Sequence, residues 1–113
     1  MKAYLIGDPC YVVPSEEWEG LLESSDFFRK PVGYTSSGKQ VMAFHTAHGD
    51  GYYFDNMGNS YSVDAGVIGI MEAEDFKDPD DMMTVHMFDE LPECHANDGV
   101  LYFGDVIINT DTL

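Results

Sequence analysis

Residues 44–70 read FHTAHGDGYYFDNMGNSYSVDAGVIGI, a run of short apolar segments separated by glycine-containing turns. Strands are expected at 39–46, 52–55, 60–63 and 67–71, because each segment is rich in aromatic, β-branched or other apolar residues and is bounded by turn-forming residues. The HGDG sequence at 48–51 predicts a hairpin into the next strand, and NMGN predicts a second tight turn. The stretch therefore predicts an antiparallel meander.

The first of these strands has fairly apolar side chains on both faces. Because successive side chains of a strand point to opposite sides, one face carries Val41, Ala43 and His45 and the other carries Met42, Phe44 and Thr46.

One helix is expected N-terminal to this region, at about 15–26. Ser15 is a favourable N-cap residue, and the two glutamates that follow it suit the positive end of a helix. An apolar face is predicted by residues at i, i+3, i+4 and i+7 spacing, namely Trp18, Leu21, Leu22 and Ser25. Before the helix, a Gly-Asp-Pro-Cys turn at 7–10 separates the apolar runs 3–6 and 11–13.

The C-terminal half alternates loops with short strands. An acidic solvated loop with room for one helical turn is expected at 72–81, because Pro79 stops any longer element. Strands are expected at 84–88, 100–103 and 106–109, and a loop at 91–97. We therefore predict a single α+β domain over 1–113, with one helix on a strongly bent antiparallel sheet or partial barrel.

The charge is the unusual feature of the composition. The chain has 21 acidic and 5 basic residues, for a formal net charge of -16. Such a field repels nucleic acids and anionic membranes and attracts basic partners. We therefore expect no direct nucleic-acid or membrane partner. Solubility or adaptation to a salt-rich cytoplasm is an alternative explanation of the charge.

Targeting and redox features point to a cytoplasmic protein. The two cysteines, Cys10 and Cys94, lie far apart and form no C-x-x-C motif. The four apolar residues after Lys2 are too short for a signal peptide. No apolar run approaches the ~18 residues of a membrane span.

Two stretches carry a resemblance to a known group. Residues 5–12 read LIGDPCYV, with Trp18 shortly after, and a GDG-x-Y sequence at 49–53 leads to VDAGVIG at 63–69. This combination resembles small uncharacterised proteins of bacteriophage and bacterial genomes, which open with a strand, a GDPCY-type turn and a strand. The resemblance implies a phage-associated or bacterial setting, with the host cytoplasm as the location of a phage-encoded protein. It implies no activity.

A ligand pocket is one functional hypothesis, built on polar residues at the bends. His45-x-x-His48-x-Asp50 has the residue types of a zinc or iron site, although the spacing spans a strand end and a turn. Asp8 and Asp64 lie at other bends, where carboxylates usually accept backbone N–H bonds and fix turns. The alternative to a metal site is therefore a set of structural side chains, and no metal or cofactor is assigned.

Nucleophilic catalysis by Cys10 would require a nearby base. No known cysteine-protease signature surrounds this residue, and packing as a small hydrophobic side chain is the alternative. No complete catalytic set is present in the sequence, so no catalytic residue is assigned.

The acidic loop carries the leading functional hypothesis. Its densest carboxylates are Glu72, Glu74, Asp75, Asp78, Asp80 and Asp81. Regularly spaced carboxylates can imitate the phosphates of duplex DNA, which has one charge per ~1.7 Å of axis. We therefore expect an interaction protein that binds a basic surface of a host protein, in the manner of a DNA mimic or anti-defence inhibitor. A solvated loop without function is the alternative reading of these charges. A small-molecule or metal-dependent enzyme or sensor, or a virion component, are the other functional alternatives.

Overall fold

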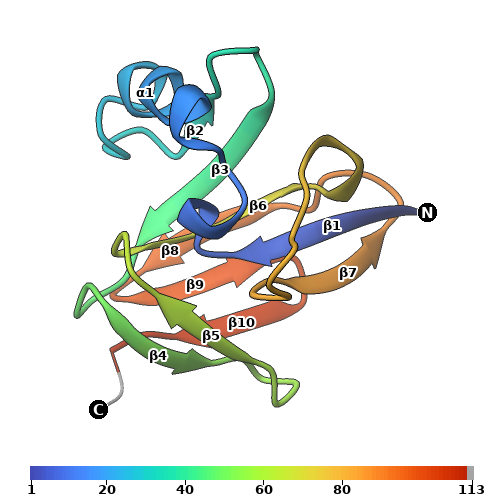
Figure 1. Cartoon of the computed structure of the whole chain (residues 1–113). Coiled ribbons are helices and arrows are strands. Elements are labelled where there is room, and N and C mark those ends of the chain that lie inside the picture. The colour runs from blue at the N-terminus through green and yellow to red at the C-terminus, as the bar shows by residue number, and fades with distance from the viewer. Residues whose placement is uncertain (112–113) are drawn as a thin grey trace.

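The computed structural model describes residues 1–111 and contains one helix and ten strands in three antiparallel sheets (Figure 1). The helix is α1 (Ser15–Ser24). The strands are β1 (Lys2–Gly7), β2 (Val32–Tyr34), β3 (Gln40–His45), β4 (Gly51–Phe54), β5 (Ser60–Val63), β6 (Val67–Glu72), β7 (Thr84–Phe88), β8 (Cys94–Asn97), β9 (Val100–Phe103) and β10 (Val106–Asn109). Two 3₁₀ turns, η1 (Pro9–Tyr11) and η2 (Ala73–Asp75), complete the fold. The predicted α+β class is confirmed, and no sheet closes into a barrel within residues 1–111.

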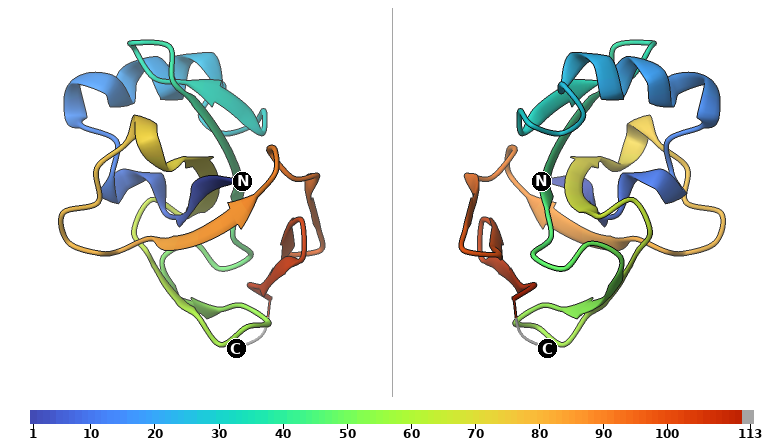
Figure 2. Two further views of the ribbon diagram at one scale, coloured as in Figure 1. Left: turned by 90° about the vertical axis from the view of Figure 1, so that its right-hand side faces the viewer. Right: turned by 90° about the vertical axis from the view of Figure 1, so that its left-hand side faces the viewer.

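A five-stranded sheet in the order β2-β3-β6-β1-β7 lies in the middle of the molecule. Its two faces support two separate cores. On one face, side chains such as Leu5, Val41 and Met71 pack under α1 and η1. On the other, side chains such as Ile6 and Ile70 pack against the smaller sheets β4-β5 and β10-β9-β8. The helix and the β4–β5 hairpin consequently lie on opposite sides of the molecule (Figure 2).

Strand β3 confirms the expectation of two apolar faces, since Val41 and Ala43 belong to one core and Met42 and Phe44 pack against the other. The predicted hairpin from β3 into β4 is wrong. β3 pairs with β2 and β6, whereas β4 pairs with β5 alone. A strand that is apolar on both faces is best buried inside a sheet, so the HGDG bend carries the chain into another layer instead of back along β3. Only the β4–β5 hairpin of the predicted meander forms among the described residues.

The helix is shorter than predicted at its C-terminal end. Ser25 is its C-cap, and Asp26, Phe27 and Phe28 have left-handed φ angles of 52°, 56° and 63°. The Ser25 hydroxyl donates to the Leu21 carbonyl at 2.7 Å and accepts from the Phe28 amide at 3.0 Å, which fixes this reversal. At the other end the N-cap is Pro14, so Ser15 does not have its predicted capping role.

The apolar run at 11–13 forms the end of η1 and the turn that follows it, which place Val12 and Val13 in the core beneath α1. One further expectation is corrected. The loop expected at 91–97 contains β8, which pairs with β9. Asp98 and Gly99 have φ angles of 51° and 82°, the left-handed pair that closes a two-residue hairpin. The predicted 72–81 loop contains one helical turn, η2.

No helix within residues 1–111 has the length and apolar character needed to cross a membrane.

A substitution in the helix tests how closely it packs on the loop after β2. An ideal Cβ on Gly20 would lie 2.5 Å from the Ser36 backbone nitrogen. In an isolated helix, Gly→Ala is stabilising by about 1 kcal/mol. We expect Gly20→Ala to lower the free energy of unfolding by roughly 1–3 kcal/mol instead, because the methyl group overpacks the backbone contact.

Urea unfolding measures this difference directly, and Glu19→Ala is the control in the same helix. Glu19 is exposed, so its replacement should change the stability by no more than about 0.5 kcal/mol. A Gly20→Ala variant more stable than the wild type would contradict the close contact.

Candidate functional site

The carboxylate of Asp8 is a structural group at the first bend. Asp8 is completely buried. Its Oδ1 accepts the Cys10 amide at 2.9 Å, and its Oδ2 accepts the amides of Asp64 and Ala65 at 2.7 and 2.6 Å. The carboxylate therefore has three backbone donors and joins the β1–η1 bend to the β5–β6 bend, which are far apart in the sequence.

Asp64 belongs to the same corner of the molecule. Its Oδ2 accepts the Tyr11 hydroxyl at 2.6 Å, and its backbone amide is one of the donors to the Asp8 carboxylate. The Asp8 oxygens accept turn-fixing backbone amides, and Asp64 accepts a side-chain hydroxyl from η1, which corresponds to the structural alternative considered for these bends.

Cys10 lies two residues after Asp8 and is partly buried. Burial raises the pKa of its thiol to about 12, and the neighbouring carboxylates of Asp8 and Asp64 act in the same direction. A thiol with this pKa is almost fully protonated at neutral pH and is a poor nucleophile. Its environment suits packing better than covalent catalysis.

The histidine cluster is dispersed. The ring of His45 packs edge-on against Phe28, with 6.4 Å between ring centroids. His48 Nε2 lies 3.4 Å from Asp111 Oδ1. Asp50 is exposed at the start of β4. Residues 1–111 contain no group of three His, Cys, Asp or Glu side chains arranged to hold a metal ion.

A second buried carboxylate, Asp55, was not singled out as a site residue by the sequence. Asp55 Oδ1 accepts the amides of Met57 and Asn59 at 2.8 and 2.9 Å. Its Oδ2 accepts the Asn59 side-chain amide at 2.9 Å and the Tyr61 hydroxyl at 2.7 Å. Asp-x-x-x-Asn between two predicted strands is the available sequence signal, since such residues cap tight turns.

Tyr61 extends this network into the main sheet. Its hydroxyl lies 3.0 Å from Thr84 Oγ1, which in turn lies 2.9 Å from His86 Nε2. Burial lowers the pKa of His86 and favours the neutral ring, against the weaker opposing charges of Asp55 and Asp105. The chain of hydrogen bonds links the β4–β5 turn to β7.

The acidic segment 72–81 divides into structural and free carboxylates. Glu72 forms an ion pair with Lys2 at 2.7 Å, and Asp78 accepts the amides of Met82 and Met83, each at 2.9 Å. The remaining four carboxylates have no hydrogen bond or ion pair among the described residues. These are Glu74, Asp75, Asp80 and Asp81, which we call the free acidic group.

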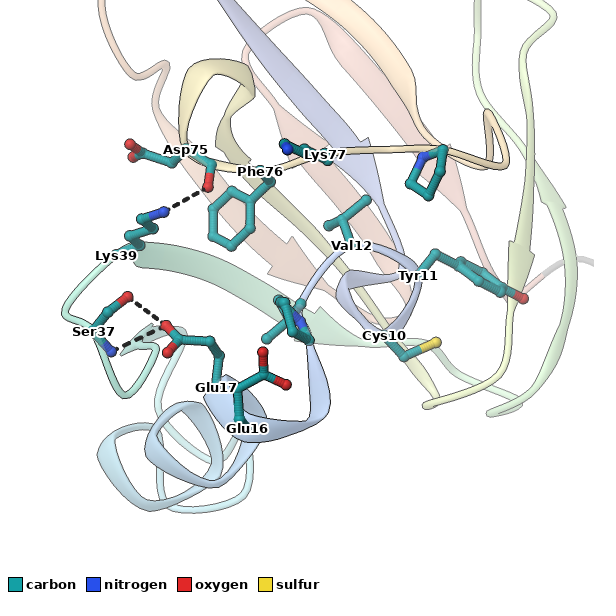
Figure 3. A pocket seen from close by; sticks show the side chains of 13 residues that line it. Cys10, Tyr11, Val12, Glu16, Glu17, Ser37, Lys39, Asp75, Phe76 and Lys77 are labelled. Atoms are coloured by element: carbon teal, nitrogen blue, oxygen red, sulfur yellow. Dashed lines mark hydrogen bonds between the residues drawn. The ribbon is translucent and has the colours of Figure 1, made fainter.

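A groove of about 680 Å³ brings part of this segment opposite the start of α1 (Figure 3). Val12 and Phe76 are among its apolar lining residues, and Glu16 and Glu17 of the helix line it together with Asp75. Glu17 accepts hydrogen bonds from the Ser37 amide at 3.0 Å and from its hydroxyl.

Two of the five basic residues of the chain, Lys39 and Lys77, also line this groove. Lys39 Nζ donates to the Asp75 carbonyl at 3.0 Å and lies 6.0 Å from the centroid of the Phe76 ring. The groove therefore carries charges of both signs around an apolar lining. Cys10 borders the same groove, whereas His48 and Asp50 line a different cavity beside β4.

Comparisons of the chain with protein-family models, with curated proteins and with solved structures find no significant match.

The Cys10 environment makes a prediction about thiol chemistry. In a Cys94→Ser variant at pH 8, iodoacetamide should alkylate Cys10 at least about 100-fold more slowly than the same variant unfolded in urea, because the thiolate is the reacting form. Mass spectrometry of quenched time points gives both rates. Native Cys10 reacting as fast as an unfolded thiol would instead favour the nucleophile hypothesis.

The Asp55 network makes a prediction about acid stability. Burial tends to raise the pKa of Asp55, but hydrogen bonds from Tyr61, Asn59 and Met57 outweigh it and lower the pKa overall. A carboxyl group whose pKa is lower in the folded state contributes stability above its unfolded pKa of about 3.9 and loses it as the pH falls through the folded value. Asp55→Asn should cost about 1–3 kcal/mol at pH 7 and should reduce the further loss of stability between about pH 5 and pH 2.

Urea unfolding across this pH range tests the assignment. Asp80→Asn removes an exposed carboxylate and should follow the wild-type pH profile. If the profile of Asp55→Asn also matched that of the wild type, the acid sensitivity would lie in other groups.

Proposed function

We propose that this protein binds a basic surface of a partner protein through carboxylates that its own fold leaves free. The observation that carries the proposal is that few carboxylates of the chain form ion pairs with its own basic residues. Among residues 1–111, two ion pairs join a Lys or Arg to a carboxylate, Lys2–Glu72 and Arg29–Asp26. Most other carboxylates are exposed, so a large part of the acidic side chains behind the net charge of -16 faces the solvent and is accessible to a partner.

The distribution of structural roles supports this proposal over a ligand-binding enzyme or sensor. The candidate pocket residues Asp8 and Asp64 accept hydrogen bonds that fix bends. Cys10 borders one cavity while His48 and Asp50 border another. By contrast, the free acidic group has no role in holding the fold.

The finer form of the proposal is an inhibitor that imitates DNA in a host cell. Its support is the acidic composition, the density of carboxylates in 72–81 and the resemblance to phage-type proteins. Such a partner would be a DNA- or RNA-binding protein whose basic surface meets the free acidic group, and association would be fast and salt-dependent.

A charge-neutralising variant tests the proposal. We expect a variant with Glu74→Gln, Asp75→Asn, Asp80→Asn and Asp81→Asn to bind its partner at least about fourfold more weakly, because four surface ion pairs of ~0.2–1 kcal/mol each would be lost. Glu72 and Asp78 stay unchanged because they have structural contacts. The measurement is capture from bacterial lysate at low and high salt, with mass spectrometry of retained proteins and affinities measured on the purified partner.

The matched control neutralises four other exposed carboxylates, Glu19, Glu23, Asp89 and Glu90. It changes the net charge equally and should retain most of the binding. Equal weakening by both variants would mean that total charge, and not the free acidic group, determines association. Unchanged capture with the first variant would remove this segment from the interface.

A further inference from the structure

Strand β4 presents two large aromatic side chains to solvent. Tyr52 and Phe54 are 65% and 61% exposed, and their rings are stacked with centroids 6.0 Å apart and an interplanar angle of 28°. Tyr53 between them points inward and is 5% exposed, with its hydroxyl donating to the Gly49 carbonyl at 2.9 Å. The alternation of the strand thus places two adjacent rings outside the core.

These rings border a cavity that also contains polar groups. The cavity has a volume of about 570 Å³, and its lining includes Tyr52, Phe54, Asp50, His48 and Asn109. Asp50 is exposed, and none of the lining residues is a lysine or arginine that would neutralise its carboxylate. A second carboxylate lies close by, because Asp111 contacts His48 at 3.4 Å. Aromatic faces and unneutralised carboxylates therefore meet at one place on the surface.

The chemistry of this cavity favours a flat cation. The faces of aromatic rings carry negative electrostatic potential and attract cations, and a guanidinium group both stacks on such rings and hydrogen-bonds to carboxylates. An ammonium group provides charge without the planar stacking surface. A nucleobase within a nucleic acid would bring phosphates into the field of a chain with net charge -16, and a second copy of the chain would bring the same charge.

We propose that the β4 cavity binds the guanidinium group of an arginine side chain on a partner protein, with Tyr52 and Phe54 as the stacking surface and Asp50 as the carboxylate. This inference rests on the proposed function in taking the partner to be basic. It concerns different residues from the free acidic group, so the two proposals are tested by different variants.

The experiment compares two peptides of the same charge. One is a flexible Gly-Ser peptide with three arginines, and the other has lysines at the same positions. At about 0.15 M salt, where the Debye length is about 8 Å, we expect the arginine peptide to bind the full chain roughly 3- to 10-fold more tightly, the range that a cation–π contact of about 0.7–1.4 kcal/mol provides. Isothermal titration calorimetry gives the affinities.

The decisive variant is Tyr52→Leu/Phe54→Leu, which keeps an apolar surface and the net charge. It should bind both peptides with the affinity that the wild type has for the lysine peptide. Asp50→Asn should also reduce the preference for the arginine peptide over the lysine peptide, because it removes the carboxylate that binds the guanidinium group. The control is Tyr34→Leu, because Tyr34 is another exposed aromatic residue, on β2 at the helix side of the molecule, and its replacement should leave the preference for arginine unchanged.

Equal affinity of the wild type for both peptides would overturn the arginine site, as would a preference that persists in Tyr52→Leu/Phe54→Leu. Perturbation of the Tyr52 ring resonances by a neutral disaccharide such as maltose, without a response to the arginine peptide, would overturn it in favour of a sugar. If the arginine site is overturned but partner capture still requires the free acidic group, the proposed function remains supported. Conversely, an arginine preference without that requirement would support the β4 site alone.

Discussion

The carboxylate of Asp8 connects parts of the chain that no local interaction could bring together. It is fully buried and accepts three backbone amides, one within η1 and two at the bend between β5 and β6. The central strands β1 and β6 pair with each other immediately beside this contact, with Gly7 opposite Gly69. A buried carboxylate without donors would strongly destabilise the fold, so the burial of Asp8 depends on the arrangement of the segments that supply its three amides.

The carboxylates of this chain therefore fall into two physical classes. Asp8 and Asp55 are buried, and both have their oxygens occupied by donors from neighbouring turns. Asp78 has a comparable turn-fixing role within the acidic segment. The carboxylates of the larger class are exposed and repel one another. This repulsion lowers the stability of the fold only moderately, because water and salt screen surface charges. A basic partner would remove part of this repulsion on binding, which is the physical basis of the proposed function.

The two cavities described above differ in the electrostatics of their linings. The groove beneath α1 contains Lys39 and Lys77 opposite Glu16, Glu17 and Asp75, so charges of both signs partly compensate each other. The β4 cavity combines exposed rings with Asp50 and has no lysine or arginine in its lining. The two cavities lie on opposite sides of the central sheet, because one borders α1 and η1 and the other borders the β4–β5 hairpin. The β4 cavity is the better environment for a cation, because its lining has aromatic faces and a carboxylate without a lysine or arginine beside them.

The class of the fold, most of the strands and the acidic composition could all be predicted from the amino-acid sequence. Periodicity and turn residues are local signals, and they correctly indicated the strands at β3, β4, β5, β6, β7, β9 and β10 and the single helix. They could not determine which strands pair, because β3 satisfies its two apolar faces with β2 and β6 and not with the strand that follows it. Cys94 to Asn97 gave little apolar alternation, and β8 forms there because the tight turn at Asp98-Gly99 aligns it with β9.

The same division holds for the candidate site. Residue types identified Asp8, Asp64 and the histidines as polar groups at bends, and charge density identified the segment 72–81. Which carboxylates accept backbone amides and which are free depends on the tertiary fold, because two of the three donors to Asp8 come from residues more than fifty positions away. The exposure of Tyr52 and Phe54 was likewise a tertiary outcome. In a strand with three consecutive aromatic residues, the middle ring lies on the opposite face from the outer two. Which face is buried depends on how the hairpin packs against β10 and the central sheet, and here the middle ring, Tyr53, is in the core.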